Sequence, residues 1–484
     1  MRVNMPKTNK DTACNTFKTI IKWLRTFLNS YLFYAIEFLM ALGFVLGYAE
    51  VAGVLVFAAL IAFILVVCDD ITPTTLPFLL VCAVATNCYD SFDTFIKFAP
   101  FAPLIIGSVL FHFIYYRKPY ATGNSVKGLI AVSIALIAGG IGRYSLLDYA
   151  KGAYYVFGLG VGMIIAYLVM KSEFSYKERE YDIKERFSVI MLLWALLSIC
   201  IMLIGEYRVE KYGAEFLSRY KLAFSPNNIA TFLMFAMPFP LYLSKKNALW
   251  AIFTPIILYG LFYSGSRGGI LFGCVEFCVC AAYWAYLGEK DVKHTLFGKK
   301  ISRRTIRVVL VSSVALFCVI VSMARFSEVW AKIDGVLKLS SYKKEVRYTM
   351  ILEAFENFRE NPLVGTGILD DSIAYGSMNK KGTMTWYHMM IPQVIGSMGL
   401  IGIAAYVFQF IDRVELIFTK KTAWSLCLGI SYLGILLMSQ VNPGEFCPLP
   451  FELLTVLLFV FQEERMESKP LTKESFLRRK NKKG

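Results

Sequence analysis

The sequence predicts an all-α polytopic membrane protein, and its composition and its apolar runs carry this prediction. Hydrophobic residues make up 57% of the 484 residues and charged residues only 18%, whereas soluble domains are about 45–50% apolar. The mean hydropathy is +0.54. A helix needs roughly 17–25 apolar residues to cross about 30 Å of hydrocarbon. We therefore predict one integral membrane domain over residues 1–484 and exclude a soluble one.

About fourteen apolar runs are predicted to cross the membrane as helices, because backbone groups inside lipid must find their hydrogen-bond partners within the chain. In order they are 31–48, 51–68, 74–89, 98–116, 127–141, 153–170, 188–205, 228–243, 248–264, 268–287, 307–323, 390–410, 423–439 and 448–462.

Lysine and arginine are concentrated in alternate connections between these runs, and short cytoplasmic loops are the ones that retain positive charge. The basic segments are "MRVNMPKTNK", "YYRKPY", "KSEFSYKEREYDIKER", "LSKKN", "GEKDVKHTLFGKKISRRTIR", "TKKT" and the tail 463–484. Both termini are therefore predicted to be cytoplasmic in a cytoplasmic-membrane protein. The net charge of +16 then reflects topology and attraction to the inner leaflet, and nucleic acid is not an expected partner.

Two connections on the opposite side are longer than turns, at 206–227 and 324–389. Loops of this length are usually functional or disordered. Inside the larger loop, apolar residues recur at helical spacing, and Asn361-Pro362 is a helix stop. These apolar residues are Val346, Met350, Ile351, Phe355 and Phe358. The large exported loop is thus predicted to be partly helical.

His388 lies in "TWYHMMIPQVIGSMGLIGI", residues 385–403, just before an apolar run. His112 falls near the cytoplasmic end of a predicted span and His294 falls in a basic loop, so His388 is the histidine available at the outer face. Imidazole has a pKa near 6.5 and can accept a proton from a hydroxyl at neutral pH. The alternative is that His388 belongs with Trp386 and Tyr387 to an interfacial aromatic belt.

Arg267 lies in "YSGSRGGILFG", residues 263–273, at the outer end of a predicted span. A guanidinium group suits bidentate recognition of phosphate, and the neighbouring glycines allow close approach of backbone to backbone or to a ligand. The alternative is an arginine that extends to the membrane surface from a turn between helices.

A third polar segment, "LSRYKLAFSPNNIATF", places Arg219, Lys221, Asn227 and Asn228 just before another predicted span. These side chains are candidates for binding an anionic substrate. Pro-Asn-Asn is equally explained as a helix start, since Asn is a favoured N-cap residue.

Four stretches together resemble the O-antigen ligase and O-antigen polymerase superfamily of polytopic glycosyltransferases. They are "RYKLAFSPNNIA", "SGSRGGILFG", "VRYTMILEAFENFRENPLVGTGI" and "WYHMMIPQVIGSMGLIGI". The resemblance covers about residues 206–410. It implies that Arg267 and Arg347 hold the lipid diphosphate, that Arg219 is a further basic residue, and that His388 activates the acceptor hydroxyl. Met389 follows the histidine, where the family often has Asn or a similar polar residue.

The expected reaction is the polymerisation or transfer of polyprenyl-diphosphate-linked oligosaccharide units at the outer face of the membrane during surface polysaccharide biosynthesis. Lys221, Asn227 and Tyr387 are further candidate substrate-binding residues. No cofactor and no metal are expected, since adjacent Asp370 and Asp371 fit a solvated turn better than a cation site.

The acceptor is a glycan or an envelope molecule, so polymerase and ligase activities both remain open. The expected partners besides the lipid bilayer are chain-length regulator and flippase proteins. A flippase or another transporter is the alternative from outside the enzymes, although transporters commonly contain internal repeats and polar residues at the midplane.

Overall fold

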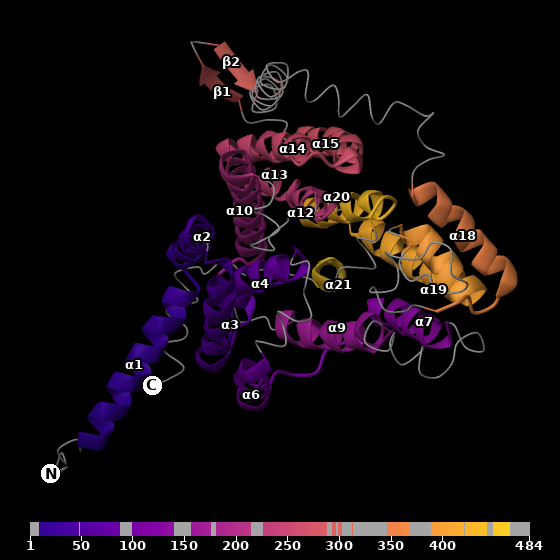
Figure 1. The fold of residues 1–484 in the computed structure, drawn as a ribbon. Coiled ribbons are helices and arrows are strands. Elements are labelled where there is room, and N and C mark those ends of the chain that lie inside the picture. Colours follow the sequence, from indigo (N-terminus) through magenta and orange to yellow (C-terminus); the bar gives the residue numbers. More distant parts are fainter. Residues whose placement is uncertain are drawn as a thin grey trace. The chain divides into compact units, whose positions relative to one another are not determined.

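The computed structural model describes most of the predicted helical regions (Figure 1). The described residues are 9–47, 49–87, 99–139, 156–175, 181–213, 226–287, 293–296, 299–302, 312, 346–367, 387, 389–420, 422–442 and 449–464. The chain divides into two compact units, Met1–Lys118 with Leu196–Ala223, and Pro119–Ala195 with Phe224–Gly484.

The first unit is helical in all of its described elements. These are α1 (Asn9–Leu28), α2 (Tyr31–Leu46), α3 (Glu50–Val67), η1 (Thr72–Thr74), α4 (Thr75–Asn87), η2 (Ala99–Phe101), α6 (Ala102–Tyr115) and the last part of α10 (Ile183–Tyr212). Within this unit α3 packs against α4 and α6.

The second unit holds the remaining elements and all the described candidate site residues. Its helices are α7 (Ser125–Ala138), α9 (Val161–Phe174), the first part of α10, α12 (Pro226–Ala236), α13 (Phe239–Leu243), η3 (Ala248–Ile252), α14 (Phe253–Tyr263), α15 (Arg267–Tyr286), α18 (Val346–Glu360), α19 (Met390–Thr419), α20 (Ala423–Met438) and α21 (Leu449–Glu463). Two short strands, β1 (Lys293–Leu296) and β2 (Lys299–Ser302), form an antiparallel hairpin.

The predicted all-α character is confirmed for the described helices, with this hairpin as a local addition. Every predicted span overlaps one of these helices except 307–323, of which the structure describes residue 312 alone. Among the described residues, four helices are long and apolar enough to cross a membrane, and a bent pair would make a fifth. The four are Val156–Phe174, Ile183–Tyr212, Arg267–Ala285 and Met390–Thr419. Shorter apolar helices occupy other predicted spans, so the count of fourteen remains a prediction.

Helix starts in both units follow local chemistry. Ser30 caps α2 by accepting a hydrogen bond from the Phe33 amide, and Thr422 caps α20 by accepting one from the Ser425 amide. Such caps satisfy amides that have no partner inside the helix. Pro226 opens α12, where its missing N–H and fixed φ are favourable.

The helix predicted within the loop 324–389 is confirmed as α18, which ends at Glu360, directly before Asn361-Pro362. α18 lies beside α19 (Figure 1). A core in the second unit joins α19 to α7 through residues such as Val132, Leu136 and Met398, all at most 5% exposed.

Candidate functional site

The candidate site begins where α12 and α15 start side by side. The Ser266 hydroxyl donates a 2.7 Å hydrogen bond to Asn227 Oδ1. The same hydroxyl accepts a 3.0 Å bond from the Gly269 amide and thereby caps α15. Arg267 is the first residue of α15 and its side chain is exposed. The structure thus brings together two predicted site residues, Asn227 and Arg267, that are 40 positions apart in the chain.

Asn227 and Asn228 lie in the first turn of α12, after Pro226, so the prediction of a helix start is confirmed and neither residue is the N-cap. Asn228 is instead used for packing, since its Oδ1 accepts a 3.1 Å hydrogen bond from Asn442 Nδ2. Asn442 and Asn228 are each 8% exposed. Polar side chains at such positions join helices in an apolar environment.

The glycines after Arg267 provide room for this packing. A Cβ on Gly269 would lie 2.6 Å from the Cβ of Ala230 in α12, and one on Gly268 would lie 2.4 Å from Val441 Cγ2. Gly265 has φ +72°, a conformation that other residues adopt only with strain. These glycines therefore serve the approach of backbone to neighbouring segments, and they hold the first turn of α15 against α12 and the turn after α20.

That turn, Ser439–Asn442, also reaches the start of α19. The Ser439 carbonyl accepts a 2.8 Å hydrogen bond from the Met390 amide. The turn therefore contacts three segments, which contain Asn228, Gly268 and Met390. Sequence reasoning did not identify it. In the sequence, this turn is marked only by three polar residues, Ser439, Gln440 and Asn442, at the end of an apolar run.

Tyr387 is fully buried between α18 and α19. Its hydroxyl accepts a 2.6 Å hydrogen bond from Asn357 Nδ2, and its amide donates a 2.9 Å bond to Gln393 Oε1. Met350, Ala354 and Met389 complete an apolar cluster around it. Tyr387 is thus anchored inside the protein at both its side chain and its backbone. Asn357 and Gln393, which are 8% and 0% exposed, are polar residues that the sequence analysis did not select.

The loop after α18 is hydrogen-bonded into a break in α19. Gly399, inside α19, has φ 59° and ψ −149°. In an unbroken helix the amides of residues 400 and 401 would bond to the carbonyls of 396 and 397. Here Leu400 and Ile401 donate to the carbonyls of Pro362 and Leu363, at 2.8 and 3.1 Å.

The carbonyl groups that this break leaves without a partner inside α19 also accept hydrogen bonds. Those of Gly396 and Ser397 accept hydrogen bonds from the amides of Thr366 and Gly367, at 3.0 and 2.8 Å. Four backbone bonds thus join the "NPLVGTG" segment to α19. Irregular backbone at membrane depth requires this kind of partner, and the bonds fix the end of α18 relative to α19.

Several predicted site residues lie outside this description. His388, Arg219, Lys221, Asp370 and Asp371 are outside the described residues. Arg347 is described as part of the α18 backbone only. Its backbone is three residues, or roughly 4.5 Å along the helix axis, before Met350. Met350 packs with Tyr387 and Met389, which are the sequence neighbours of His388. Among the described residues, no group of three or more His, Cys, Asp or Glu side chains could hold a metal ion.

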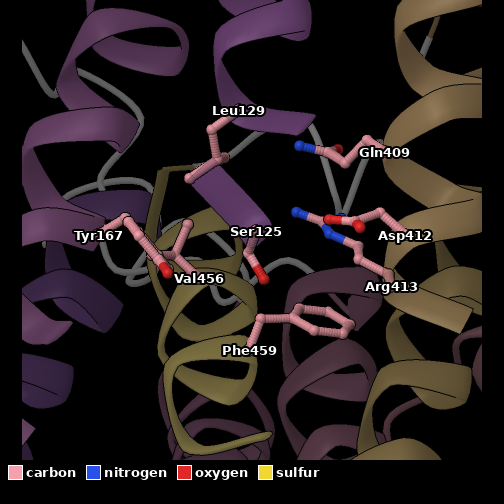
Figure 2. A pocket seen from close by; sticks show the side chains of 8 residues that line it. All are labelled: Ser125, Leu129, Tyr167, Gln409, Asp412, Arg413, Val456 and Phe459. Atoms are coloured by element: carbon pink, nitrogen blue, oxygen red, sulfur yellow. The ribbon is translucent and has the colours of Figure 1, made fainter. Parts of the chain in front are cut away.

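A separate pocket lies among α7, α9, α19 and α21 (Figure 2). It is lined by Ser125, Leu129, Tyr167, Gln409, Asp412, Arg413, Val456 and Phe459. Its cavity volume is about 10 Å³, whereas ligand-binding pockets usually have volumes of about 300–1,000 Å³. The pocket is therefore too small for a glycan, and its residues are not those of the candidate site.

Glu463 belongs to a buried network of charged and hydrogen-bonding groups beside this pocket. Its carboxylate accepts hydrogen bonds from Tyr167 Oη at 2.5 Å and from the Ser125 amide at 2.6 Å, and it lies 2.9 Å from Lys171 Nζ. Burial alone would raise the pKa of Glu463. The hydrogen bonds from Tyr167 and Ser125 and the charge of Lys171 outweigh that effect, so the pKa is lowered from its ordinary value.

The helices and the candidate site together indicate the class of this protein. It is an integral membrane protein whose candidate polar residues lie at the ends of apolar helices. Comparison with known families then gives a match to part of the chain. Residues 252–407 match the family described as O-antigen ligase, which supports the predicted resemblance to the O-antigen ligase and polymerase superfamily. No curated protein and no solved structure gives a significant match.

The matched residues include Arg267, Arg347 and His388, whereas Asn227 and the turn Ser439–Asn442 lie outside the match. The family indicates a membrane glycosyltransferase that uses a lipid-linked glycan donor and a glycan acceptor. The family match therefore favours an enzyme over the alternative that this protein is a flippase.

Proposed function

We propose that this chain polymerises lipid-linked oligosaccharide repeat units at the outer face of the cytoplasmic membrane, with both termini in the cytoplasm. The donor is a polyprenyl-diphosphate-linked glycan. The observation that carries the proposal is the convergence of distant candidate segments on one turn. Asn227, Arg267 and Tyr387 each lie within three residues of a residue that contacts Ser439–Asn442. The family match over residues 252–407 supports the same chemistry.

In the proposed reaction the oxygen of the acceptor hydroxyl attacks the anomeric carbon of the donor sugar. The bond from that carbon to the diphosphate oxygen breaks, and the polyprenyl diphosphate leaves with the electron pair. His388 takes the hydroxyl proton as general base. Arg267 and Arg347 stabilise the negative charge that develops on the diphosphate, because guanidinium groups bind phosphate oxygens in pairs. Arg219, Lys221 and Asn227 are further proposed contacts to the donor.

The residues around His388 suit the task of holding a base in position. The Tyr387 amide before it is bonded to Gln393, and the Met390 amide after it is bonded to Ser439. Asn357 holds the Tyr387 hydroxyl. We assign Asn357 and Gln393 as positioning residues, because a catalytic group must be fixed within a fraction of an ångström to be effective.

The decisive variant is His388→Gln, which keeps hydrogen bonding but cannot accept a proton near neutral pH. With purified protein in proteoliposomes and a defined lipid-linked repeat unit, we expect a rate about 10²–10⁴-fold below that of the parent, with donor binding retained. His294→Gln, in the predicted cytoplasmic loop, is the matched control and should keep the parental rate. Parental turnover by His388→Gln across pH 6–8 would exclude the general base and leave the chemistry to the arginines.

The same assay separates the two acceptor classes. Product that lengthens with the lipid-linked unit alone indicates a polymerase, whereas product that forms only after a separate envelope glycolipid is added indicates a ligase. Chain-length regulator and flippase proteins are the proposed physiological partners. Adding a chain-length regulator should change the distribution of polymer lengths.

A further inference from the structure

The second half of α1, from Lys18 to Leu28, carries an apolar stripe and a basic stripe on opposite sides. Ile20, Leu24 and Phe27 recur at helical spacing on one side, and Lys18, Lys22 and Arg25 recur at the same spacing on the other. Residues four and three apart share a face of a helix. α1 is therefore amphipathic, unlike α2 that follows it, in which Glu37 is the one charged residue.

The apolar side of α1 is not covered by the described part of the first unit. Ile20 is 54% exposed and Trp23 is 65% exposed, and the Trp23 ring stacks on Phe27 at 5.7 Å. Lys18 and Lys22 are exposed as well. Among the described side chains of α1, only Leu28 in the last turn is buried, at 2% exposed. Exposed tryptophan beside exposed lysine is typical of a helix at a membrane surface.

Arg25 attaches the end of α1 to the ends of two apolar helices. Its Nε donates a 2.8 Å hydrogen bond to the Val67 carbonyl at the end of α3. Its Nη2 donates a 3.0 Å bond to the Tyr116 hydroxyl just after α6. The predicted topology places both of these helix ends on the cytoplasmic side, next to the basic segment "YYRKPY".

α1 also departs from the direction of the helix that follows it. The segments Lys18–Leu28 and Tyr31–Leu46 are bent by 65°, and Ser30 begins α2 as a separate, capped helix. If the two segments formed one span, Lys18 and Lys22 would lie on the membrane-embedded segment, where lysine is strongly disfavoured. A helix on the membrane surface avoids that cost.

We propose that α1 lies on the cytoplasmic surface of the bilayer and binds anionic phospholipid headgroups. Ile20, Trp23 and Phe27 insert between acyl chains, and Lys18 and Lys22 face the phosphates. Charge complementarity specifies the occupant, because the cytoplasmic leaflet is negatively charged and attracts such basic segments. The proposal concerns membrane attachment and does not depend on the proposed transferase activity.

The test uses the full-length protein in nanodiscs of phosphatidylcholine alone, or of phosphatidylcholine and phosphatidylglycerol at about 7:3, an anionic content that gives a substantial negative surface potential. Amide hydrogen exchange over residues 16–28 should be severalfold slower in the anionic discs. Lys18→Gln/Lys22→Gln should abolish this difference and leave the exchange of α2 unchanged. The matched control, Lys245→Gln/Lys246→Gln, removes two exposed lysines elsewhere and should retain it.

A second measurement tests insertion. Lipids brominated in the acyl chains should quench a component of tryptophan fluorescence that is present in the parent and absent from Trp23→Phe. Equal exchange in the two kinds of disc would overturn the proposal. So would a lipid effect that survives Lys18→Gln/Lys22→Gln, or a Trp23 component that bromine does not quench.

Discussion

Replacing Gly399 by alanine tests the junction between the "NPLVGTG" loop and α19. Gly399 has φ 59° and ψ −149°, a region that is essentially restricted to glycine. A Cβ at this position would lie 2.6 Å from the Pro362 carbonyl oxygen and 2.8 Å from the Gly365 amide nitrogen. Both are backbone atoms, so the clash cannot be relieved by turning a side chain.

The expected loss of stability has two parts. Holding a residue other than glycine in this backbone conformation costs about 1–3 kcal/mol. Displacing the loop to make room weakens the bonds that Leu400 and Ile401 donate to it, each worth about 0.5–1.5 kcal/mol net. We therefore expect Gly399→Ala to lower the free energy of unfolding by roughly 2–6 kcal/mol.

The assay is thermal unfolding of the purified protein in detergent, with the midpoint temperature compared at equal protein concentration. Gly107→Ala in α6 is the matched control, because a Cβ there would meet nothing within 4 Å. This control should be neutral or stabilising by up to about 1 kcal/mol, given the helix propensity of alanine. If Gly399→Ala unfolds at the same temperature as the parent, the break in α19 does not contribute to stability as argued.

Three further predictions follow from the site and its surroundings. Arg267→Lys and Arg347→Lys should each reduce turnover at least about tenfold at equal protein level, because lysine cannot supply a planar pair of donors; normal product from either variant would restrict that arginine to packing or topology. Gly434→Ala should lower the unfolding midpoint by the equivalent of about 1–3 kcal/mol, since the new Cβ would lie 2.7 and 2.8 Å from the carboxyl oxygens of Glu276 and this fully buried side chain would have to shift within a packed interior; an unchanged midpoint would contradict this. Because the pKa of Glu463 is lowered in the folded protein, its stabilising contribution should be complete above the ordinary glutamate pKa of about 4.3 and should disappear as the pH falls through the lower folded-state value. Glu463→Gln should therefore be less stable at pH 7 and lose less stability on acidification, and parallel pH profiles for the two proteins would refute the assignment.

The helices were largely predictable, because a long apolar run is a local property of the chain. α18 was predicted from five apolar positions and a terminal Asn-Pro, and its end at Glu360 matches that signal. α1 was missed because its apolar residues cover only one face, so no continuous apolar run marks it. The break in α19 was missed because it depends on a partner segment that precedes it by more than thirty positions.

The candidate site was predictable as a set of residue types but not as an arrangement. Arg267 and Asn227 were selected separately, and Ser266, which joins them, carries no distinctive local pattern. The bond from Asn442 to Asn228 spans 214 positions, so no periodicity along the chain could indicate it. Such contacts arise from tertiary packing, which local sequence patterns do not encode.

The motifs that carry the family resemblance combine two kinds of residue, and stability measurements can separate them. Arg267 is exposed, whereas its neighbours Ser266 and Gly269 cap and pack α15. In the same way Tyr387 is fully buried beside His388. Variants of the capping and packing residues should therefore lower stability and activity together, since they shift the backbone that carries the chemical group. Arg267→Lys should lower activity alone, because surface substitutions usually change stability by no more than about 0.5 kcal/mol. If Arg267→Lys instead destabilised the protein as much as a Gly269 variant, Arg267 would belong to the packing and the diphosphate would need another partner.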